Sequence, residues 1–218
     1  MIARTAACQQ RPLTWFTAAG NVGPDLEHGI STGMDGAERQ LLMDERDVTR
    51  ALARMAREIV ERNRGVGALS LVGIQRRGVQ LAGRIADEIE RAEGQRPPAG
   101  SLDITLYRDD LTAIGPRPVL GETRLPNGGI DHRVVVIVDD VCYTGRTVRA
   151  ALDELADFGR PARILLCVLV DRGGRELPIH PDITGRVVEA ANLQRVDVLV
   201  PEIDGRLAVE LITAAPPH

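Results

Sequence analysis

A run of five β-branched apolar residues, at positions 134–138, constrains the fold more than any other feature of the sequence. The run has no polar alternation, which is typical of a strand buried on both faces of a parallel sheet. It stops at two adjacent carboxylates, Asp139 and Asp140. A short turn follows, and from position 144 onward the apolar residues take helical spacing. The sequence therefore predicts a strand, an acid pair, a loop and a helix, in an α/β protein.

The loop between the acid pair and the helix has the composition of a phosphate-binding site. Gly145 lets the backbone approach a ligand closely, and Thr144 and Thr147 supply hydroxyls beside the amides of a helix N-terminus, which attract an anion. Two adjacent carboxylates repel a phosphate, but they can accept hydrogen bonds from a ribose diol and stabilise a developing sugar cation. Asp139 and Asp140 are therefore the first candidates for catalytic residues.

A hydrophobic strand that ends in two aspartates also occurs as the Walker B element of nucleotide-hydrolysing proteins, or as a strand end without chemistry. The 27 basic residues of this chain are all arginine. Without lysine, the phosphate loop Gly-x-x-x-x-Gly-Lys-Ser/Thr cannot exist, and Schiff-base chemistry is excluded as well.

Two other stretches follow the same pattern of buried strands that end in polar loops. Residues 69–74 predict a second buried strand, and a helix follows the loop at residues 75–78. Residues 163–170 predict a third buried strand, which ends at Asp171 and Arg172. Because binding sites in open parallel sheets lie beyond the carboxyl ends of strands, we expect these two residues near a ligand pocket.

The remaining segments predict shorter or less regular structure. Residues 101–107 alternate like a half-exposed strand, and residues 108–132 carry the prolines and glycines of a long, functional lid. A small hood is expected from residues 177–188. Residues 196–200 predict a short strand, and residues 208–212 predict an edge strand.

Residues 44–63 predict an amphipathic helix whose apolar side chains recur along one face. A second stripe on this helix is basic and consists of Arg46, Arg50, Arg54 and Arg57. The stripe can be a solvated face with ion pairs to acidic residues four positions on, or a surface that faces RNA.

The length of 218 residues predicts one domain. Residues 1–37 show no sustained periodicity and are expected to be a disordered extension, which leaves residues 38–218 as the folded domain. Three cysteines lack the spacing of a metal site or a disulfide framework, and no apolar run of membrane-spanning length occurs, so we expect a cytoplasmic protein without membrane contact. The net charge of -4 and the 2% aromatic content argue against a protein that coats nucleic acid indiscriminately.

Four motifs, in order along the chain, resemble those of the pyrimidine operon attenuation protein/uracil phosphoribosyltransferase family, which belongs to the type I phosphoribosyltransferases. They are DITLYRDDL at 103–111, the segment at 135–147 that resembles the binding motif for phosphoribosyl diphosphate (PRPP), GRTVRAAL at 145–152, and VDRGGRELPI at 170–179. The resemblance implies a type I phosphoribosyltransferase fold, which is a twisted parallel sheet with flanking helices, a small hood and a flexible flap.

The resemblance also implies a reaction and a set of site residues. The chain is expected to make UMP and diphosphate from uracil and PRPP, with magnesium held mainly by substrate oxygens and water rather than by direct protein ligands. The catalytic set is Asp139, Asp140 and, on the leaving diphosphate, Arg108. The implied PRPP- and UMP-binding residues are Val141, Cys142, Tyr143, Thr144, Gly145, Arg146 and Thr147. Those implied for the diphosphate are Arg76, Arg77 and Gly78, and those for the base pocket are Asp171 and Arg172.

Regulation is the second implied activity, because members of the family bind the mRNA leader of pyrimidine genes in response to UMP. The sequence departs from the family where relatives are thought to touch RNA, for example at Gly174 and Arg57, which replace the usual histidines. Arg57, Arg175 and Arg186 keep positive charge there and are the candidate RNA-binding residues. A phosphoribosyltransferase without RNA regulation, acting on uracil or a purine base, is the alternative. We expect a homodimer or a higher homo-oligomer, since exposed arginine-rich helices can also form dimer contacts.

Overall fold

The computed structural model describes residues 30–32, 37–107, 121–191 and 193–214. The larger of its two sheets has five strands in the order β4-β3-β5-β6-β7, and every neighbouring pair is parallel. These strands are β3 (Leu69–Ile74), β4 (Ala99–Leu102), β5 (Val134–Cys142), β6 (Arg163–Asp171) and β7 (Ile183–Val187). The smaller sheet is antiparallel and has the order β1-β2-β9-β8. Its strands are β1 (Ile30–Thr32), β2 (Glu38–Met43), β8 (Gln194–Leu199) and β9 (Ala208–Thr213).

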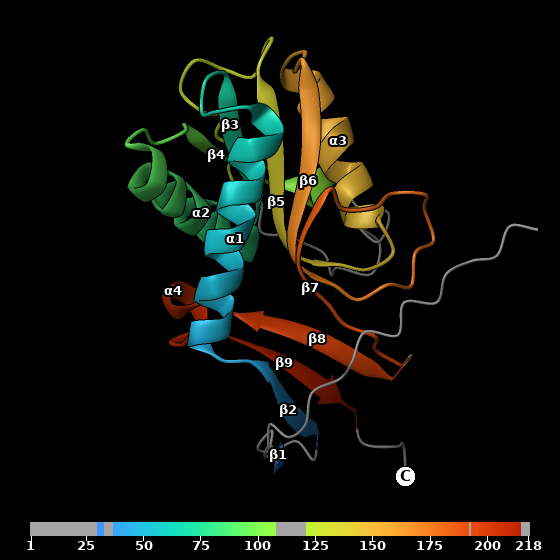
Figure 1. Ribbon diagram of the computed structural model, residues 1–218. Helices are drawn as coiled ribbons and strands as arrows, with labels where there is room; N and C mark the ends of the chain where they lie inside the picture. Colours follow the sequence, from blue (N-terminus) through green and yellow to red (C-terminus); the bar gives the residue numbers. More distant parts are fainter. Residues whose placement is uncertain (1–29, 33–36, 108–120, 192, 215–218) are drawn as a thin grey trace, which may run out of the picture.

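Helices cover both faces of the parallel sheet (Figure 1). On one face, α1 (Glu45–Asn63) and α2 (Arg77–Glu93) bury their apolar side chains against alternate residues of β3 and β5. On the other face, α3 (Arg146–Phe158) and a 3-10 turn (Ile104–Tyr107) cover the intervening residues of the same two strands. This division explains why β3 and the first part of β5 are almost entirely apolar, because both of their faces are buried. The one buried hydroxyl, that of Ser70 in β3, accepts a hydrogen bond from Arg133 Nε at 2.6 Å.

The first helix forms where the periodicity predicts it. Asp44 is its N-cap, and Asp44 Oδ1 accepts the backbone N–H of Asp47 at 2.8 Å. The helix ends at Arg64, which adopts a left-handed conformation with φ 59°. The predicted strands at 69–74 and 163–170 are confirmed as well.

The smaller sheet forms the hood, and the prediction of its position was wrong. Residues 177–188 were expected there, but β7 lies in the parallel sheet, where it pairs with β6. The hood is built instead from β1 and β2, which precede α1, and from β8 and β9 near the carboxyl end. Its inner side joins the core under α1 and α2 (Figure 1). The strand β9 was expected at an edge, but it lies between β2 and β8.

Three further predictions need correction or lie outside the described residues. The predicted strand at 101–107 ends at Leu102, because the chain turns into a 3-10 helix at Ile104. Residues 30–32, within the expected extension, form the strand β1. The part of the predicted lid at 108–120, including Arg108, lies outside the described residues, as does most of the range 1–37.

Candidate active site

The acid pair lies inside the central strand of the parallel sheet, and not after its end as predicted, because β5 continues in register with β6 as far as Cys142. Asp139 is buried and Asp140 is half-buried. Asp139 Oδ1 accepts the backbone N–H of Asp140 at 3.0 Å, and Asp140 Oδ1 accepts that of Val141 at 2.8 Å. These bonds fix both carboxylates at the carboxyl end of the strand.

The pKa of both carboxyl groups is raised above the ordinary value of an aspartate. Burial is the main cause for Asp139, and the nearby charge of Asp140 adds to it. Burial also raises the pKa of Asp140, but the N–H of Val141 and the positive charge of Arg77 act in the opposite direction. Because burial disfavours the charged form, a cationic group that binds beside the pair would relieve this cost.

The loop after β5 leads into the N-terminus of α3. The first helical bond runs from the N–H of Arg149 to the carbonyl of Gly145 at 3.0 Å, and the N–H of Arg146 is taken by Thr144 Oγ1 at 3.3 Å. Among the described residues, no acceptor takes the N–H groups of Thr147 and Val148. Two free amides at a helix N-terminus, together with the helix dipole, make a site for an anion.

Gly145 is required at the turn before α3. It adopts φ 92°, and a Cβ at this position would lie 3.3 Å from Leu177 Cβ. The segment after β6 therefore packs directly on the loop, and the carbonyl of Thr144 accepts the N–H groups of Glu176 and Leu177, both at 3.0 Å. Arg146 Nε donates to Glu176 Oε2 at 2.8 Å, which holds the arginine beside the same segment.

The first turn of α2 lies against the acid pair. A Cβ at Gly78 would lie 2.5 Å from the carbonyl oxygen of Val138 and 3.3 Å from the Cα of Asp139, so only glycine allows this approach. Arg77 precedes Gly78 and forms two hydrogen bonds with the carboxylate of Asp204 in the hood, at 2.9 and 3.1 Å. The structure therefore brings Gly78 and Arg77 to the acid pair, and their assignment to the diphosphate stays a prediction.

Arg76 has a different environment. It is exposed, follows a cis peptide bond from Gln75, and lines a cavity of about 400 Å³. The other lining residues are Gln75, Val79, Gln80, Ser101, Glu122, Arg124 and Ile203. This cavity lies between α2, β4 and the short helix α4 (Pro201–Asp204), and its lining includes neither carboxylate of the acid pair.

The predicted base pocket lies beside the phosphate loop. The guanidinium carbon of Arg172 lies 3.8 Å from the ring centre of Tyr143, and a Cβ at Gly174 would collide with the same ring. Asp171 forms an ion pair with Arg175 at 2.7 Å. Among the described residues, the buried Nε of Arg172 has no hydrogen-bond acceptor. A donor that is buried and unpaired is open to a ligand carbonyl.

Arg175 is part of this site and not of the outer surface. Its side chain is only 12% exposed. Arg175 Nη1 donates to the carbonyls of Tyr143 at 2.7 Å and Gly173 at 3.1 Å, and its Nε donates to that of Ile179 at 2.8 Å. We therefore correct its assignment as an RNA contact, because these bonds use the guanidinium to shape the loop after β6.

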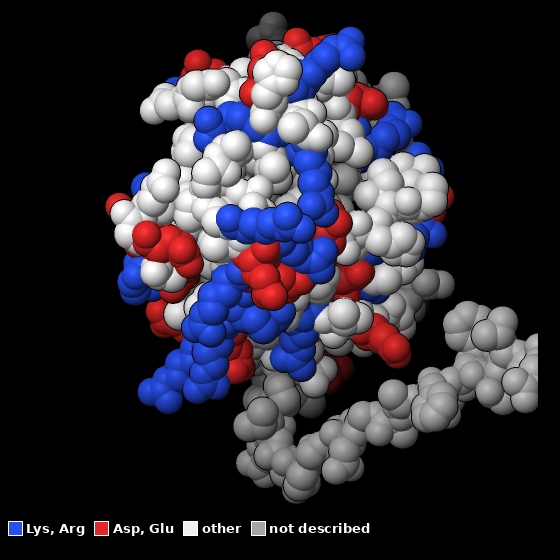
Figure 2. All heavy atoms as spheres, turned by 45° about the horizontal axis from the view of Figure 1, so that its top comes forward, with Lys and Arg blue, Asp and Glu red and all other residues white. Residues whose placement is uncertain are grey.

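The face that carries α1 shows basic and acidic side chains interleaved (Figure 2). Glu58 pairs with Arg54 at 3.7 Å and with Arg62 at 2.8 Å, so part of the basic stripe is neutralised. Arg57 is exposed and makes no ion pair or hydrogen bond within the described part of the chain. Arg186 donates to the carbonyl of Leu42. Of the candidate RNA contacts, Arg57 and Arg186 thus lie on the surface.

Sequence reasoning did not identify Asp204 or Glu176, which hold Arg77 and Arg146. Asp204 is 127 positions away from Arg77 in the chain, and no local pattern connects them. Glu176 lies in a recognised motif, but its partner is set by how the segment after β6 folds onto α3.

Comparison with known proteins gives a consistent result. A family profile described as "Phosphoribosyl transferase domain" matches residues 42–199. Two similar relatives carry the name "Bifunctional protein PyrR". The protein from Herpetosiphon aurantiacus is 58% identical over 75% of this chain and 90% of its own length. The protein from Thermus thermophilus is 56% identical over 78% of this chain and 93% of its own length.

Among solved structures, the hypoxanthine phosphoribosyltransferase of Trypanosoma cruzi is similar, with a TM-score of 0.58 at 18% identity. The match covers 80% of this chain and 97% of that protein. At such low identity the likeness shows the fold alone. The predicted type I phosphoribosyltransferase fold is confirmed. No helix in the described part of the chain combines the length and apolar character needed to span a membrane.

Proposed function

Because this chain belongs to the phosphoribosyltransferase family and, within it, to the PyrR family, we propose that it makes UMP from uracil and PRPP and binds pyrimidine-gene mRNA when UMP is bound. One observation carries the proposal, namely that the acid pair of β5 lies a few residues before the open N-terminus of α3. This arrangement joins a site for a developing cation to a site for a phosphate.

The 5-phosphate of PRPP would bind at the N-terminus of α3. The unengaged N–H groups of Thr147 and Val148 supply two donors, and the hydroxyl of Thr144 can supply another. Val141 and Cys142, the last two residues of β5, and Tyr143 in the loop after them connect the acid pair to this turn. The fixed distance from the phosphate site to the acid pair would place the ribose between them.

The acid pair would act on the ribose. The bond from C1′ to the diphosphate oxygen breaks, the bond from C1′ to N1 of uracil forms, and the N1 proton is released. Positive charge develops on the sugar ring during this exchange, and Asp139 and Asp140 are held in place to stabilise it. Their oxygens can also accept hydrogen bonds from the ribose diol.

The diphosphate would leave on the side of α2, where Arg77 and Gly78 approach the acid pair. Arg76 and Arg108 are proposed as further diphosphate contacts. Magnesium would enter with PRPP, since this ion prefers phosphate oxygens and water. No cluster of three metal-binding side chains occurs among the described residues, and the half-buried carboxylate of Asp140 could accept hydrogen bonds from the water shell of the ion.

Uracil would lie beside Arg172 and Tyr143. The buried Nε–H of Arg172 has no acceptor among the described residues, and a carbonyl oxygen of the base could take it. The ion pair between Asp171 and Arg175 keeps the loop that carries Arg172 in place. We therefore retain Asp171 and Arg172 as base-pocket residues, Asp171 through its effect on the loop.

RNA would bind across the face that carries α1 (Figure 2). Arg57 is the strongest candidate, because its charge is not neutralised within the described part of the chain. Arg186 lines a cavity of about 420 Å³ beside α1, and within the described ranges its guanidinium donates only to the carbonyl of Leu42, which leaves further N–H donors for a phosphate. Phosphate contacts of this kind give affinity without sequence readout.

Calorimetric titration with UMP and then GMP tests the enzyme site. We expect UMP to bind, and we expect UMP formation when uracil and PRPP are mixed with the protein and magnesium. Preferential binding of GMP would contradict the uracil assignment. Absence of both UMP binding and turnover would contradict the proposed enzyme function altogether.

The regulatory activity needs a separate test with a pyrimidine-gene leader transcript. We expect UMP to increase RNA affinity, and the slope of log K against log salt to fall by about one in an Arg57→Gln variant. Arg91→Gln, which removes the same charge from an exposed position on α2, serves as the control and should keep the slope. RNA affinity that is indifferent to UMP would leave only the transferase.

A further inference from the structure

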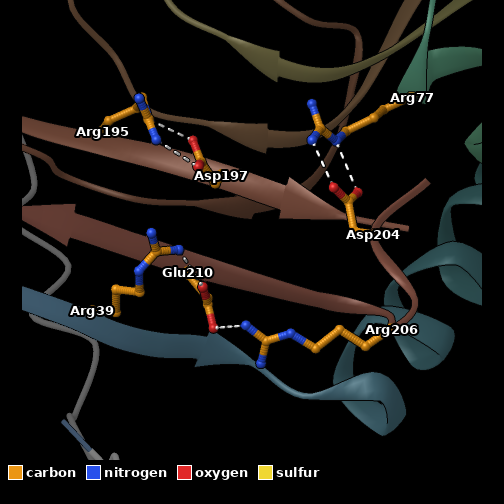
Figure 3. A network of polar contacts seen from close by, with 7 residues as sticks. All are labelled: Arg39, Arg77, Arg195, Asp197, Asp204, Arg206 and Glu210. Atoms are coloured by element: carbon orange, nitrogen blue, oxygen red, sulfur yellow. Dashed lines mark hydrogen bonds and ion pairs between the residues drawn. The ribbon is translucent and has the colours of Figure 1, made fainter. Parts of the chain in front are cut away.

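The link between Arg77 and Asp204 joins the two sheets at the acid pair (Figure 3). Arg77 Nη2 donates to Asp204 Oδ1 at 2.9 Å, and Arg77 Nε donates to Asp204 Oδ2 at 3.1 Å. Asp204 Oδ2 also accepts the backbone N–H of Val200 at 2.9 Å. The Asp204 side chain is only 16% exposed. The carboxylate is therefore fixed by its own helix before it holds the arginine.

Arg77 is also fixed from the other side. It precedes Gly78, whose close approach to Val138 and Asp139 ties the first turn of α2 to the acid pair. The positive charge of Arg77 acts on Asp140. The backbone of Arg77 thus belongs to the parallel sheet and its helices, while its guanidinium is held by the hood.

The geometry of the ion pair between Arg77 and Asp204 leaves some N–H donors of Arg77 available to a ligand. A guanidinium has five N–H donors in one plane, and a carboxylate that takes the Nε and Nη2 edge fixes that plane. The described residues use only these two donors of Arg77, through Asp204. The other donors, including both on Nη1, are open to an anion such as the diphosphate of PRPP.

We propose that Asp204 is a positioning residue, which holds Arg77 beside the acid pair so that its free donors receive the diphosphate of PRPP. This inference rests on the proposed transferase function. It assigns to the hood, which sequence reasoning placed elsewhere in the chain, a part in binding the substrate.

The hood does not need this ion pair in order to stay attached. Val198, Val209 and Leu211 on its inner side are buried in the same core as Met55 and Ile59 of α1. Apolar burial of this kind gives most of the free energy that holds two layers together, whereas an ion pair with a partly exposed arginine gives little. The fixed carboxylate of Asp204 is therefore better explained by its effect on the position of Arg77 than by attachment of the hood.

The matched control is Asp197, on the neighbouring strand β8. It pairs with Arg195 at 2.7 and 2.9 Å, and its charge also acts on Arg77 (Figure 3). However, Asp197 forms no hydrogen bond with Arg77. Asp197→Asn thus removes one negative charge from the strand that precedes α4 and leaves the hydrogen bonds between Asp204 and Arg77 in place.

The experiment compares Asp204→Asn, Asp197→Asn, Arg77→Gln and the double variant Asp204→Asn/Arg77→Gln. We expect Asp204→Asn to raise KM for PRPP by about tenfold, with KM for uracil unchanged. Arg77→Gln should have an effect of similar size, and the double variant should be no worse than Arg77→Gln, because Asp204 acts through Arg77. Asp197→Asn should match the wild type.

A second measurement does not depend on turnover. In NMR spectra of the wild type, the Nε–H of Arg77 should exchange slowly with solvent, and its exchange should accelerate at least about tenfold in Asp204→Asn but not in Asp197→Asn. Equal exchange in all three proteins would overturn the proposal. So would multiplied losses in the double variant, or equal increases of KM for PRPP and for uracil. A wild type that exchanges slowly but makes no UMP would contradict the transferase function instead.

Discussion

The acid pair in the parallel sheet and two carboxylates of the hood differ in whether an arginine is hydrogen-bonded to them. In the parallel sheet, Asp139 and Asp140 stand side by side on β5, and burial raises the pKa of both. In the hood, Glu210 lies between Arg206 at 2.5 Å and Arg39 at 3.8 Å, and Arg77 lowers the pKa of Asp204 (Figure 3). Among the described residues, the acid pair of β5 is thus left without a hydrogen-bonded cation, whereas Asp204 and Glu210 are paired with arginines.

This difference separates a reactive site from a supporting one. Buried carboxylates that lack a cationic partner weaken the fold, and they persist where a positively charged group is to be bound. Buried carboxylates with arginine partners hold strands and loops in place, and because the arginine neutralises their charge, they do not attract another cation. Conservative substitutions that remove one negative charge at a time can therefore test whether the two sheets differ as the structure indicates.

The largest effect is expected at Asp140. In Asp140→Asn we expect kcat to fall by about 10² to 10³, because the variant loses charge that stabilises the developing cation. The affinity for PRPP should change by less than about threefold, since the substrate carries no sugar cation in its ground state. Steady-state kinetics and calorimetry measure the two quantities. Equal losses in both would argue against a role in the transition state.

A smaller effect, on stability alone, is expected in the hood. The Glu210 side chain is 7% exposed, so Glu210→Gln should lower the free energy of unfolding by about 1 to 3 kcal/mol and leave the kinetics of UMP formation unchanged. Asp197→Asn, whose partner Arg195 is 67% exposed, should stay within about 0.5 kcal/mol of the wild type. Urea denaturation tests both. Loss of activity without loss of stability in Glu210→Gln would contradict the inference that Glu210 supports the fold and takes no part in the reaction.

A gain in stability is expected only at Asp139. Its pKa is raised in the folded protein, so its contribution to stability is fully present below the pKa of the unfolded chain and is lost as the pH rises through the folded pKa. An amide cannot lose this proton, so Asp139→Asn should be more stable than the wild type at about pH 7, by on the order of 1 kcal/mol. The difference in the free energy of unfolding should disappear near about pH 4, and urea denaturation between about pH 4 and about pH 7 measures it. A variant that is no more stable than the wild type at about pH 7 would contradict the prediction.

The parallel sheet could be predicted well because its signals are local. A strand buried on both faces is mostly apolar, and a run of apolar residues located β3, β5 and β6. The acid pair and the loop before α3 are only a few residues apart in the chain, so their closeness needed no tertiary information. Even the end of β5 was misjudged only because backbone pairing continues through residues whose side chains are charged.

The hood could not be located in the same way, because its strands come from both ends of the folded chain. The sequence predicts an edge strand at 208–212 and no strand at 38–43, and only pairing with both β2 and β8 makes β9 a central strand. The region assigned to the hood, 177–188, contributes β7 to the parallel sheet instead. Sequence alone gives no sign of such pairings, because the interacting residues are far apart in the chain.

The sequence by itself determined the family, the buried strands of the parallel sheet, and the closeness of the acid pair to the loop before α3, because each depends on neighbouring residues. Only the tertiary structure decided which cations hold which acids. It placed Arg77 against Asp204, enclosed Arg175 within the site, and left Arg57 exposed. The physical reason is that long arginine side chains reach across elements, so their partners are set by packing and not by position in the chain.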